Sequence, residues 1–265
     1  MGKRELIFKP KKKSPFKRSP LSIFSMFGKS FVICCEYLIQ ASRSTFDRAT
    51  TDAFIERFWR FHFEVAKATL YTTGREHLKE DETYVFMSNH GSWMDIPAMF
   101  ATVPSSLRMV SKVELMKLPV IGHAMLNAGF IAIDRKNRNK AIRQLEHAKE
   151  RLKKGISIWI APEGTRSRDG SLAPFKKGGF HLARDLGMAI VPVYIEGARE
   201  VMPADGMWIY PNKSITVHFC EPIMTTAFDR STTNELMNKV REAILQKQKE
   251  CQERQSELEA KDDTL

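Results

Sequence analysis

The sequence predicts an α/β domain with a mostly parallel central sheet flanked by helices. Between residues 83 and 220, short apolar runs alternate with helical patterns, which is the pattern of strands joined by helical crossovers. The chain has 265 residues, of which 43% are hydrophobic and 28% are charged, a composition typical of globular proteins. This length accommodates one such domain together with terminal segments.

The elements of the predicted domain follow one another in a regular order. Strands are expected at residues 83–88, 107–111, 130–134, 156–161, 189–196 and 214–220. Helices are expected at residues 92–102, 118–129, 137–155, 178–187 and 232–245. Gly129 and Gly155 each close one of these helices, because glycine readily adopts the left-handed conformation that follows a helix. Ligands of such folds bind at the carboxyl ends of the strands.

Two different segments precede this domain. Residues 1–20 carry eight lysines and arginines against one glutamate, so this stretch holds +7 of the chain's formal charge of +11. We expect residues 1–19 to form a disordered basic arm that is attracted to polyanions. Residues 20–72 are expected to form two amphipathic, membrane-associating helices, the second over residues 53–70.

The remaining boundaries and the cellular compartment are also expectations. We expect the α/β domain to span residues 73–245, followed by a polar, solvated tail over residues 246–265. Lys29 and Glu36 interrupt the apolar run at residues 21–39, which favours a segment lying in the membrane interface over one that spans the bilayer. The four cysteines match no zinc-site spacing, which favours a reducing compartment.

The stretch "SNHGSWMDIPA", residues 88–98, has two interpretations. In the structural one, Ser92 and Asp95 form a capping pattern at the start of a helix, and His90 is an ordinary loop residue. In the catalytic one, the Asp95 carboxylate fixes one ring nitrogen of His90 and leaves the other free to accept a proton. The stretch alone does not decide between them.

Cations follow the ends of three other predicted strands. Lys112 and Arg135 follow two of them, and "APEGTRSRDGSLAPFKKGG" follows the strand at residues 156–161 with Arg166 and Lys176. Arginine and backbone N–H groups suit phosphate or carboxylate. Because strand ends of a parallel sheet converge, we expect a base beside an anion pocket, suited to the hydroxyl of a phosphorylated substrate.

The sequence resembles the 1-acyl-sn-glycerol-3-phosphate acyltransferases of phospholipid synthesis. The resemblance runs from about residue 65 to residue 221 and rests on "NHGSWMD", "GFIAIDR", "PEGTRSRDG…PFKKG" and "IVPV", which occur in the order of that family. It implies a fold like that of glycerol-3-phosphate acyltransferases, behind a membrane module of two amphipathic helices. It favours the catalytic interpretation of "SNHGSWMDIPA".

The resemblance also implies roles for individual residues. His90 would deprotonate the sn-2 hydroxyl of lysophosphatidic acid, and Asp95 would orient His90. The residues expected to hold the phosphate are Lys112, Arg135, Gly164, Thr165, Arg166 and Lys176. Glu163 would shape the same pocket, and Val191–Val193 would line the acyl side. No metal or cofactor is expected, since the thioester of acyl-CoA or acyl carrier protein is already activated.

The resemblance implies membrane attachment on the cytoplasmic side of a bacterial inner membrane, with phosphatidic acid as product. Other acceptors stay open, among them lyso-ornithine lipid, lysophosphatidylglycerol and glycerol-3-phosphate. A non-catalytic membrane module would not require the His90–Asp95 pair. A nucleic-acid-binding protein would interleave aromatic residues and cations over a folded surface. Here the cations are concentrated in the arm, so nucleic acid is not an expected partner.

Overall fold

The computed structural model describes residues 3–15, 21–43, 47–134, 155–206 and 208–262. Its strands are β1 (Glu5–Phe8), β2 (Thr69–Thr73), β3 (Val85–Ser88), β4 (Leu107–Lys112), β5 (Ile131–Ile133), β6 (Ser157–Ile160), β7 (Ile190–Glu196) and β8 (Ser214–Phe219). Its α-helices are α1 (Leu21–Arg43), α2 (Arg48–Ala66), α3 (Asp95–Thr102), α4 (Ile121–Asn127), α6 (Gly178–Asp185), α7 (Ala198–Val201) and α8 (Thr233–Asp262).

The strands form one sheet in the order β1-β2-β8-β7-β3-β6-β4-β5. All pairings from β7 to β5 are parallel, as is the pairing of β2 with β8. The exceptions are β1 with β2 and β7 with β8, which are antiparallel. The predicted α/β architecture with a mostly parallel sheet is therefore confirmed, and β3 lies near its centre between β7 and β6.

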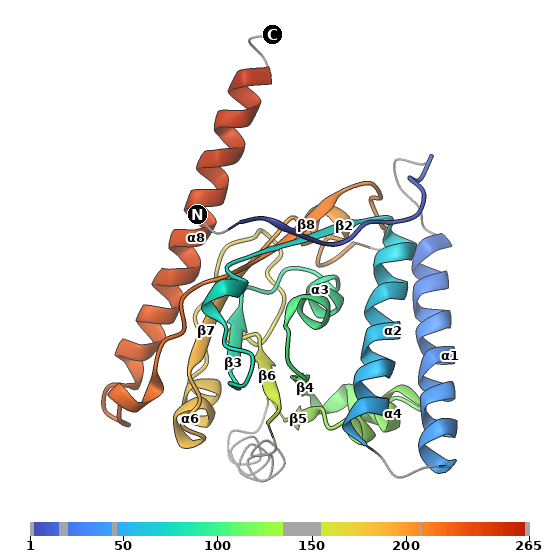
Figure 1. Cartoon of the computed structure of the whole chain (residues 1–265), viewed down its shortest axis with the longest axis horizontal. Helices are drawn as coiled ribbons and strands as arrows, with labels where there is room; N and C mark the ends of the chain where they lie inside the picture. Colours follow the sequence, from blue (N-terminus) through green and yellow to red (C-terminus); the bar gives the residue numbers. More distant parts are fainter. Residues whose placement is uncertain (1–2, 16–20, 44–46, 135–154, 207, 263–265) are drawn as a thin grey trace.

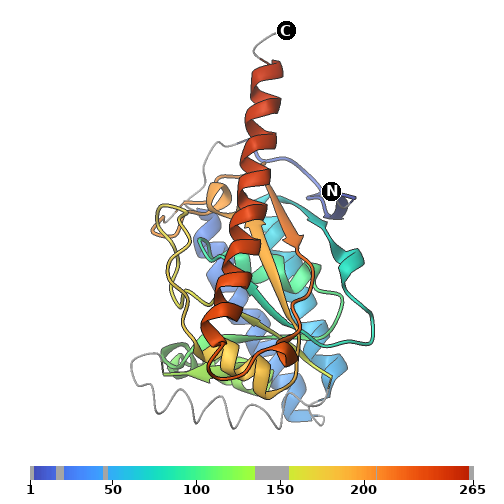
Figure 2. The same cartoon turned by 90° about the vertical axis from the view of Figure 1, so that its left-hand side faces the viewer.

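Helices cover both faces of this sheet (Figures 1 and 2), and the central strands alternate between two cores. Phe86 of β3 and Trp159 of β6 belong to the core beneath α2 and α3. Val85 and Met87 of β3 belong to the core beneath α6 and α8. This alternation follows from the two-residue period of a strand, and it explains why these strands are almost entirely apolar.

The N-terminal segment corrects the expectation of a disordered arm over residues 1–19. Residues 5–8 form β1, which extends the sheet by pairing with β2. Phe8 packs edge-on against Trp59, with 6.0 Å between ring centroids. The guanidinium of Arg4 lies 3.9 Å from the ring centroid of Tyr71. The short apolar stretch within the basic segment thus pairs with β2 at the edge of the sheet. Composition does not predict such a long-range contact.

Residues 20–72 contain two helices, α1 and α2, with bounds that differ from the expected ones, and their association with a membrane stays a prediction. Asp47 begins α2 by accepting a hydrogen bond from the Thr50 N–H at 2.6 Å, as an N-cap residue does. Helix α2 ends at Ala66, where Lys67 adopts a left-handed conformation with φ of 50°. Strand β2 then begins at Thr69, so the expected helix over residues 53–70 and the boundary at residue 72 are both wrong. No helix in the described part of the chain is long and apolar enough to cross a membrane.

The C-terminal segment corrects the expectation of a solvated tail over residues 246–265. Helix α8 continues through this segment to Asp262, and its far end projects from the body of the protein (Figure 1). Cys251 is only 1% exposed, and Arg254 bonds to Glu196 of β7. The sequence did not predict this part of α8, because most of its residues are polar and exposed and few of them are buried. The helix expected at residues 137–155 lies largely outside the described residues.

Candidate active site

His90 and Asp95 form a direct contact just beyond the carboxyl end of β3. The Nδ1 atom of His90 lies 2.7 Å from Oδ2 of Asp95. Because a carboxylate oxygen can only accept a hydrogen bond, Nδ1 carries the proton and Nε2 of the neutral ring is free to accept one. The Asp95 side chain is 1% exposed and that of His90 is 17% exposed. This pair has the geometry of a general base with its orienting carboxylate.

The turn between these two residues is held by the same carboxylate. Oδ2 of Asp95 also accepts hydrogen bonds from the backbone N–H groups of Gly91 and Ser92, both at 2.9 Å. The Ser92 hydroxyl accepts from the Met94 N–H at 3.0 Å and donates to the Met202 carbonyl at 2.7 Å. Asp95 therefore makes the contacts of the capping interpretation and also contacts the His90 ring, while the catalytic interpretation stays a prediction.

Glu163 connects the end of β6 to this turn. Its Oε1 accepts from the His90 N–H at 3.0 Å, and its Oε2 accepts from the Ala173 N–H at 2.8 Å. Burial raises the pKa of the Glu163 carboxyl, while these two N–H groups and the neighbouring charges of His90 and Arg241 act in the opposite direction. Glu163 is thus a positioning residue that ties the loop after β6 to the backbone of the base.

Three of the predicted phosphate-binding residues, Thr165, Arg166 and Lys176, lie in the loop after β6 and are more exposed than the dyad. The Ser167 N–H donates to the His90 carbonyl at 2.7 Å, which places Arg166 in the loop next to the base. Lys176 lies over Gly164, where an added Cβ would come within 3.0 Å of the lysine Nζ. Arg166 and Lys176 are themselves solvent-exposed, as is Thr165. These residues form one loop, residues 161–177, beside His90.

Two other predicted cations do not belong to this loop in the sequence. Lys112 is exposed at the end of β4, which is separated from β3 by β6. Arg135 lies outside the described residues. Val191 and Val193 are fully buried in β7, where they pair with Phe86 and Ser88 of β3. Their role toward an acyl chain stays a prediction.

Sequence reasoning missed two residues that complete the surroundings of the dyad. The Asn89 side chain accepts from the Ile195 N–H at 2.7 Å and donates to the Ile195 carbonyl at 3.0 Å. The Arg199 side chain passes so close to Gly91 that an added Cβ would lie 2.6 Å from its Cδ. No local sequence pattern points to either residue, because each contacts a segment more than 100 positions away in the sequence.

A cavity of about 470 Å³ opens beside the dyad. His90, Gly91 and Asp95 form one part of its wall, and α7 and α8 form another. Polar groups from the loop at residues 167–171 and from Gln248, Gln252 and Gln255 dominate the remainder. His90 therefore lies on a hollowed, solvent-accessible surface.

Comparisons with known proteins show which proteins the chain is similar to. Residues 69–196 match the family model "Acyltransferase". A chloroplastic 1-acyl-sn-glycerol-3-phosphate acyltransferase of Brassica napus is 33% identical over 195 residues, which cover 72% of this chain and 55% of that one. The alpha 1-acyl-sn-glycerol-3-phosphate acyltransferase of Mus musculus is 31% identical over 173 residues, covering 65% of this chain and 61% of that one. The chain thus spans a little over half the length of these two relatives.

A solved structure shows the same architecture. The 1-acyl-sn-glycerophosphate (LPA) acyltransferase PlsC of Thermotoga maritima superposes with a TM-score of 0.74 and 25% sequence identity. The superposition covers 88% of this chain and 94% of that one, so it includes most of the helices around the sheet as well as the matched family domain.

The first prediction concerns Glu163. Glu163→Gln should lower the free energy of unfolding by about 1–3 kcal/mol, because one of the two buried N–H groups would face the amide NH₂ instead of an acceptor. Chemical denaturation measures this, with Glu114→Gln as the control, since Glu114 is exposed on the 3₁₀ turn after β4. An unfolding midpoint equal to that of Glu114→Gln would show that Glu163 does not hold this loop.

Proposed function

We propose that this chain is a 1-acyl-sn-glycerol-3-phosphate acyltransferase, on the premise of the match of residues 69–196 to the acyltransferase family model. It would move a fatty acyl group from acyl-CoA or acyl carrier protein to the sn-2 hydroxyl of lysophosphatidic acid and form phosphatidic acid. The observation that carries the proposal is the His90–Asp95 contact, which leaves one imidazole nitrogen available as a base. The printed names of the relatives support the choice of acceptor.

The chemistry needs little more than this pair. Nε2 of His90 takes the proton of the acceptor hydroxyl while that oxygen attacks the thioester carbonyl. The Asp95 carboxylate stabilises the imidazolium that forms, and the thiol of the donor leaves with a proton. Arg166 and Lys176 hold the acceptor phosphate beside His90, and Lys112 contributes from the end of β4. An arginine fork suits such an anion because it can donate two parallel hydrogen bonds.

The approach of a lipid acceptor is supported by an apolar surface on α1. Large apolar side chains on one side of this helix are 42–69% exposed, namely Phe24, Phe27, Phe31, Val32 and Ile39. Phe27 packs against Trp93, with 5.4 Å between ring centroids, and Trp93 lies in the turn between His90 and Asp95. The apolar surface therefore leads directly to the catalytic turn. We propose that it lies in a membrane interface, with the basic N-terminal segment next to anionic headgroups.

The base is tested by two substitutions. His90→Ala should reduce kcat by about 100- to 10,000-fold, the usual contribution of a general base. Asp95→Asn keeps an oxygen that can accept the same hydrogen bonds but removes the charge that stabilises the imidazolium, so kcat should also fall severely. The control is His123→Ala on α4, where the histidine is exposed. A folded His90→Ala protein with the turnover of the unaltered chain would rule out this mechanism.

The phosphate loop is tested at Arg166. Arg166→Ala should raise the KM for the lysolipid by roughly 10- to 100-fold, because a hydrogen bond to a charged group contributes about 1.5–3 kcal/mol. Arg166→Lys should restore only part of this loss, because lysine lacks the planar fork. Arg168→Ala, two positions along the same exposed loop, is the matched control. A raised KM for the acyl donor with an unchanged KM for the lysolipid would reassign Arg166 to the donor.

The membrane surface is tested on α1. Replacing Phe24 and Phe31 by serine should weaken binding to anionic liposomes at least about tenfold in high salt, where burial of hydrocarbon persists and charge attraction is screened. Leu258→Ser is the control, because Leu258 is 58% exposed on the projecting end of α8. Co-sedimentation measures the binding. If the double variant sediments like the unaltered chain in high salt, α1 is not the membrane surface.

A further inference from the structure

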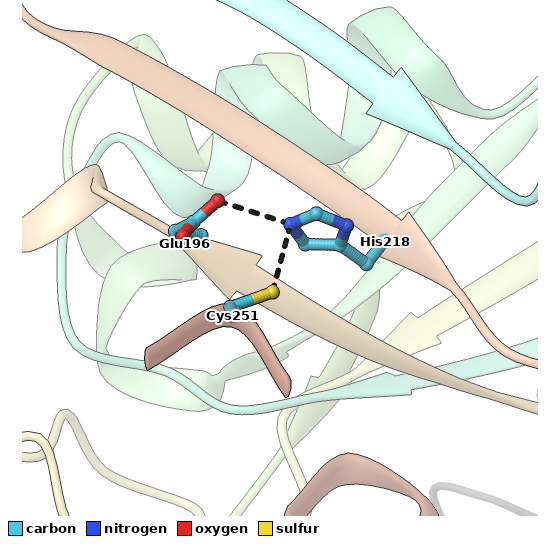
Figure 3. A group of neighbouring side chains, drawn as sticks. All are labelled: Glu196, His218 and Cys251. Atoms are coloured by element: carbon cyan, nitrogen blue, oxygen red, sulfur yellow. Dashed lines mark hydrogen bonds and ion pairs between the residues drawn. The ribbon is translucent and has the colours of Figure 1, made fainter. Parts of the chain in front are cut away.

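Three side chains outside the catalytic dyad meet where α8 lies on the sheet (Figure 3). They are Glu196 at the end of β7, His218 on β8 and Cys251 on α8. Nε2 of His218 lies 3.2 Å from Oε2 of Glu196 and 3.5 Å from Sγ of Cys251. All three candidate ligand atoms lie within 4.8 Å of one another. The sequence had predicted no metal ligands here, because 22 positions separate the first two residues and 33 separate the last two.

Two of the three separations in this cluster are close to those of a tetrahedral zinc site. Zinc bonds of about 2.0–2.1 Å to nitrogen, about 2.0–2.2 Å to oxygen and about 2.3 Å to sulfur imply tetrahedral edges of about 3.4 Å for N–O and about 3.6 Å for N–S. The two distances in this cluster differ from these edges by about 0.2 Å or less. In Figure 3 the carboxylate and the thiol lie on either side of Nε2. The third separation, from the Glu196 carboxylate to Sγ of Cys251, is within 4.8 Å, against a tetrahedral edge of about 3.6 Å.

The groups around the cluster orient its ligands. Nδ1 of His218 lies 2.9 Å from the Thr73 hydroxyl, and a ligating imidazole typically donates its second N–H to an oxygen acceptor. The Tyr194 ring stacks on the His218 ring at an interplanar angle of 17°. Nη2 of Arg254 donates to Glu196, 3.3 Å from Oε1 and 3.1 Å from Oε2. These contacts fix the ring plane and the carboxylate, so the donor atoms are held in place before any ion binds.

We propose that Glu196, His218 and Cys251 bind a thiophilic divalent cation, zinc foremost, which fastens α8 to the sheet. Sulfur, imidazole and carboxylate are all ordinary zinc ligands, and zinc accommodates them in one tetrahedron. His218 is 2% exposed and Cys251 is 1% exposed, so these two ligands have little contact with bulk solvent. Glu196 and Cys251 also line the cavity beside the dyad, so a water molecule from that cavity would complete the fourth position. Binding releases the thiol proton to solvent.

The experiment uses the full chain, freed of metal by a chelator and then titrated with Zn²⁺ or Co²⁺ alone. We expect one ion per chain by elemental analysis, a thiolate-to-cobalt charge-transfer absorption with Co²⁺, and a higher Tm with Zn²⁺. Cys251→Ser should abolish the charge-transfer absorption. Cys251→Ser and His218→Gln should each weaken zinc binding at least about 100-fold, because loss of a direct ligand should cost no less than loss of a residue that only orients a ligand, which costs up to about 100-fold. Cys220→Ser and His181→Gln are matched controls that should bind like the unaltered chain, because neither residue belongs to the cluster.

Two results would overturn the proposal, and neither depends on a difficult variant. The first is a chain that retains no stoichiometric ion and shows no charge-transfer absorption with Co²⁺. The second is zinc binding that persists unchanged in Glu196→Gln, a variant at a half-buried position whose fold is checked by circular dichroism. In either case the three groups would form a hydrogen-bonded contact only. Because the cluster excludes His90 and Asp95, these outcomes leave the proposed acyl transfer unaffected.

Discussion

The turn that carries His90 depends on one oxygen atom, Oδ2 of Asp95. It accepts from the His90 imidazole at 2.7 Å and from two successive backbone N–H groups at 2.9 Å. A carboxylate that is 1% exposed requires such donors, because an uncompensated buried charge is very costly. The same three bonds that make burial tolerable also fix the turn and the tautomer. The base therefore cannot rotate without breaking the contacts that stabilise the carboxylate.

The surrounding sheet holds that turn in place from both sides of β3. Asn89 binds the backbone of Ile195 at the end of β7, and Glu163 binds the His90 N–H from the end of β6. Glu196 directly follows Ile195 and belongs to the cluster with His218 and Cys251. The end of β7 thus has two neighbours, the dyad on one side and α8 on the other. The end of β7 therefore contacts both the turn that holds His90 and the C-terminal helix.

The sequence predicts those parts of the molecule that depend on short separations. His90 and Asp95 are five positions apart, and the strand–helix alternation that places them is readable from local periodicity. The hydrogen bond of Glu163 to the His90 N–H spans 73 positions, so only its presence in a motif was predictable. β1, the continuation of α8 and the Glu196–His218–Cys251 cluster depend on packing between distant segments. The segments that contain β1 and the end of α8 are basic or polar in composition, so the sequence favoured a disordered arm and a solvated tail.

The proposed reaction explains why the base is rigid and the cations beside it are exposed. A general base contributes only when its nitrogen is aligned with the hydroxyl, so fixed geometry favours it. A cation that awaits a phosphate gains from remaining hydrated until the ligand arrives, since a buried, unpaired charge would destabilise the fold. The loop at residues 161–177 satisfies both conditions. Its backbone is bonded to His90 through Ser167 and to Pro162 through Lys176, while the Arg166 and Lys176 side chains stay in solvent. Binding of the phosphate then costs conformational entropy only in the side chains, because the backbone of the loop is already fixed. Such a loop can bind an anion while His90 keeps its position.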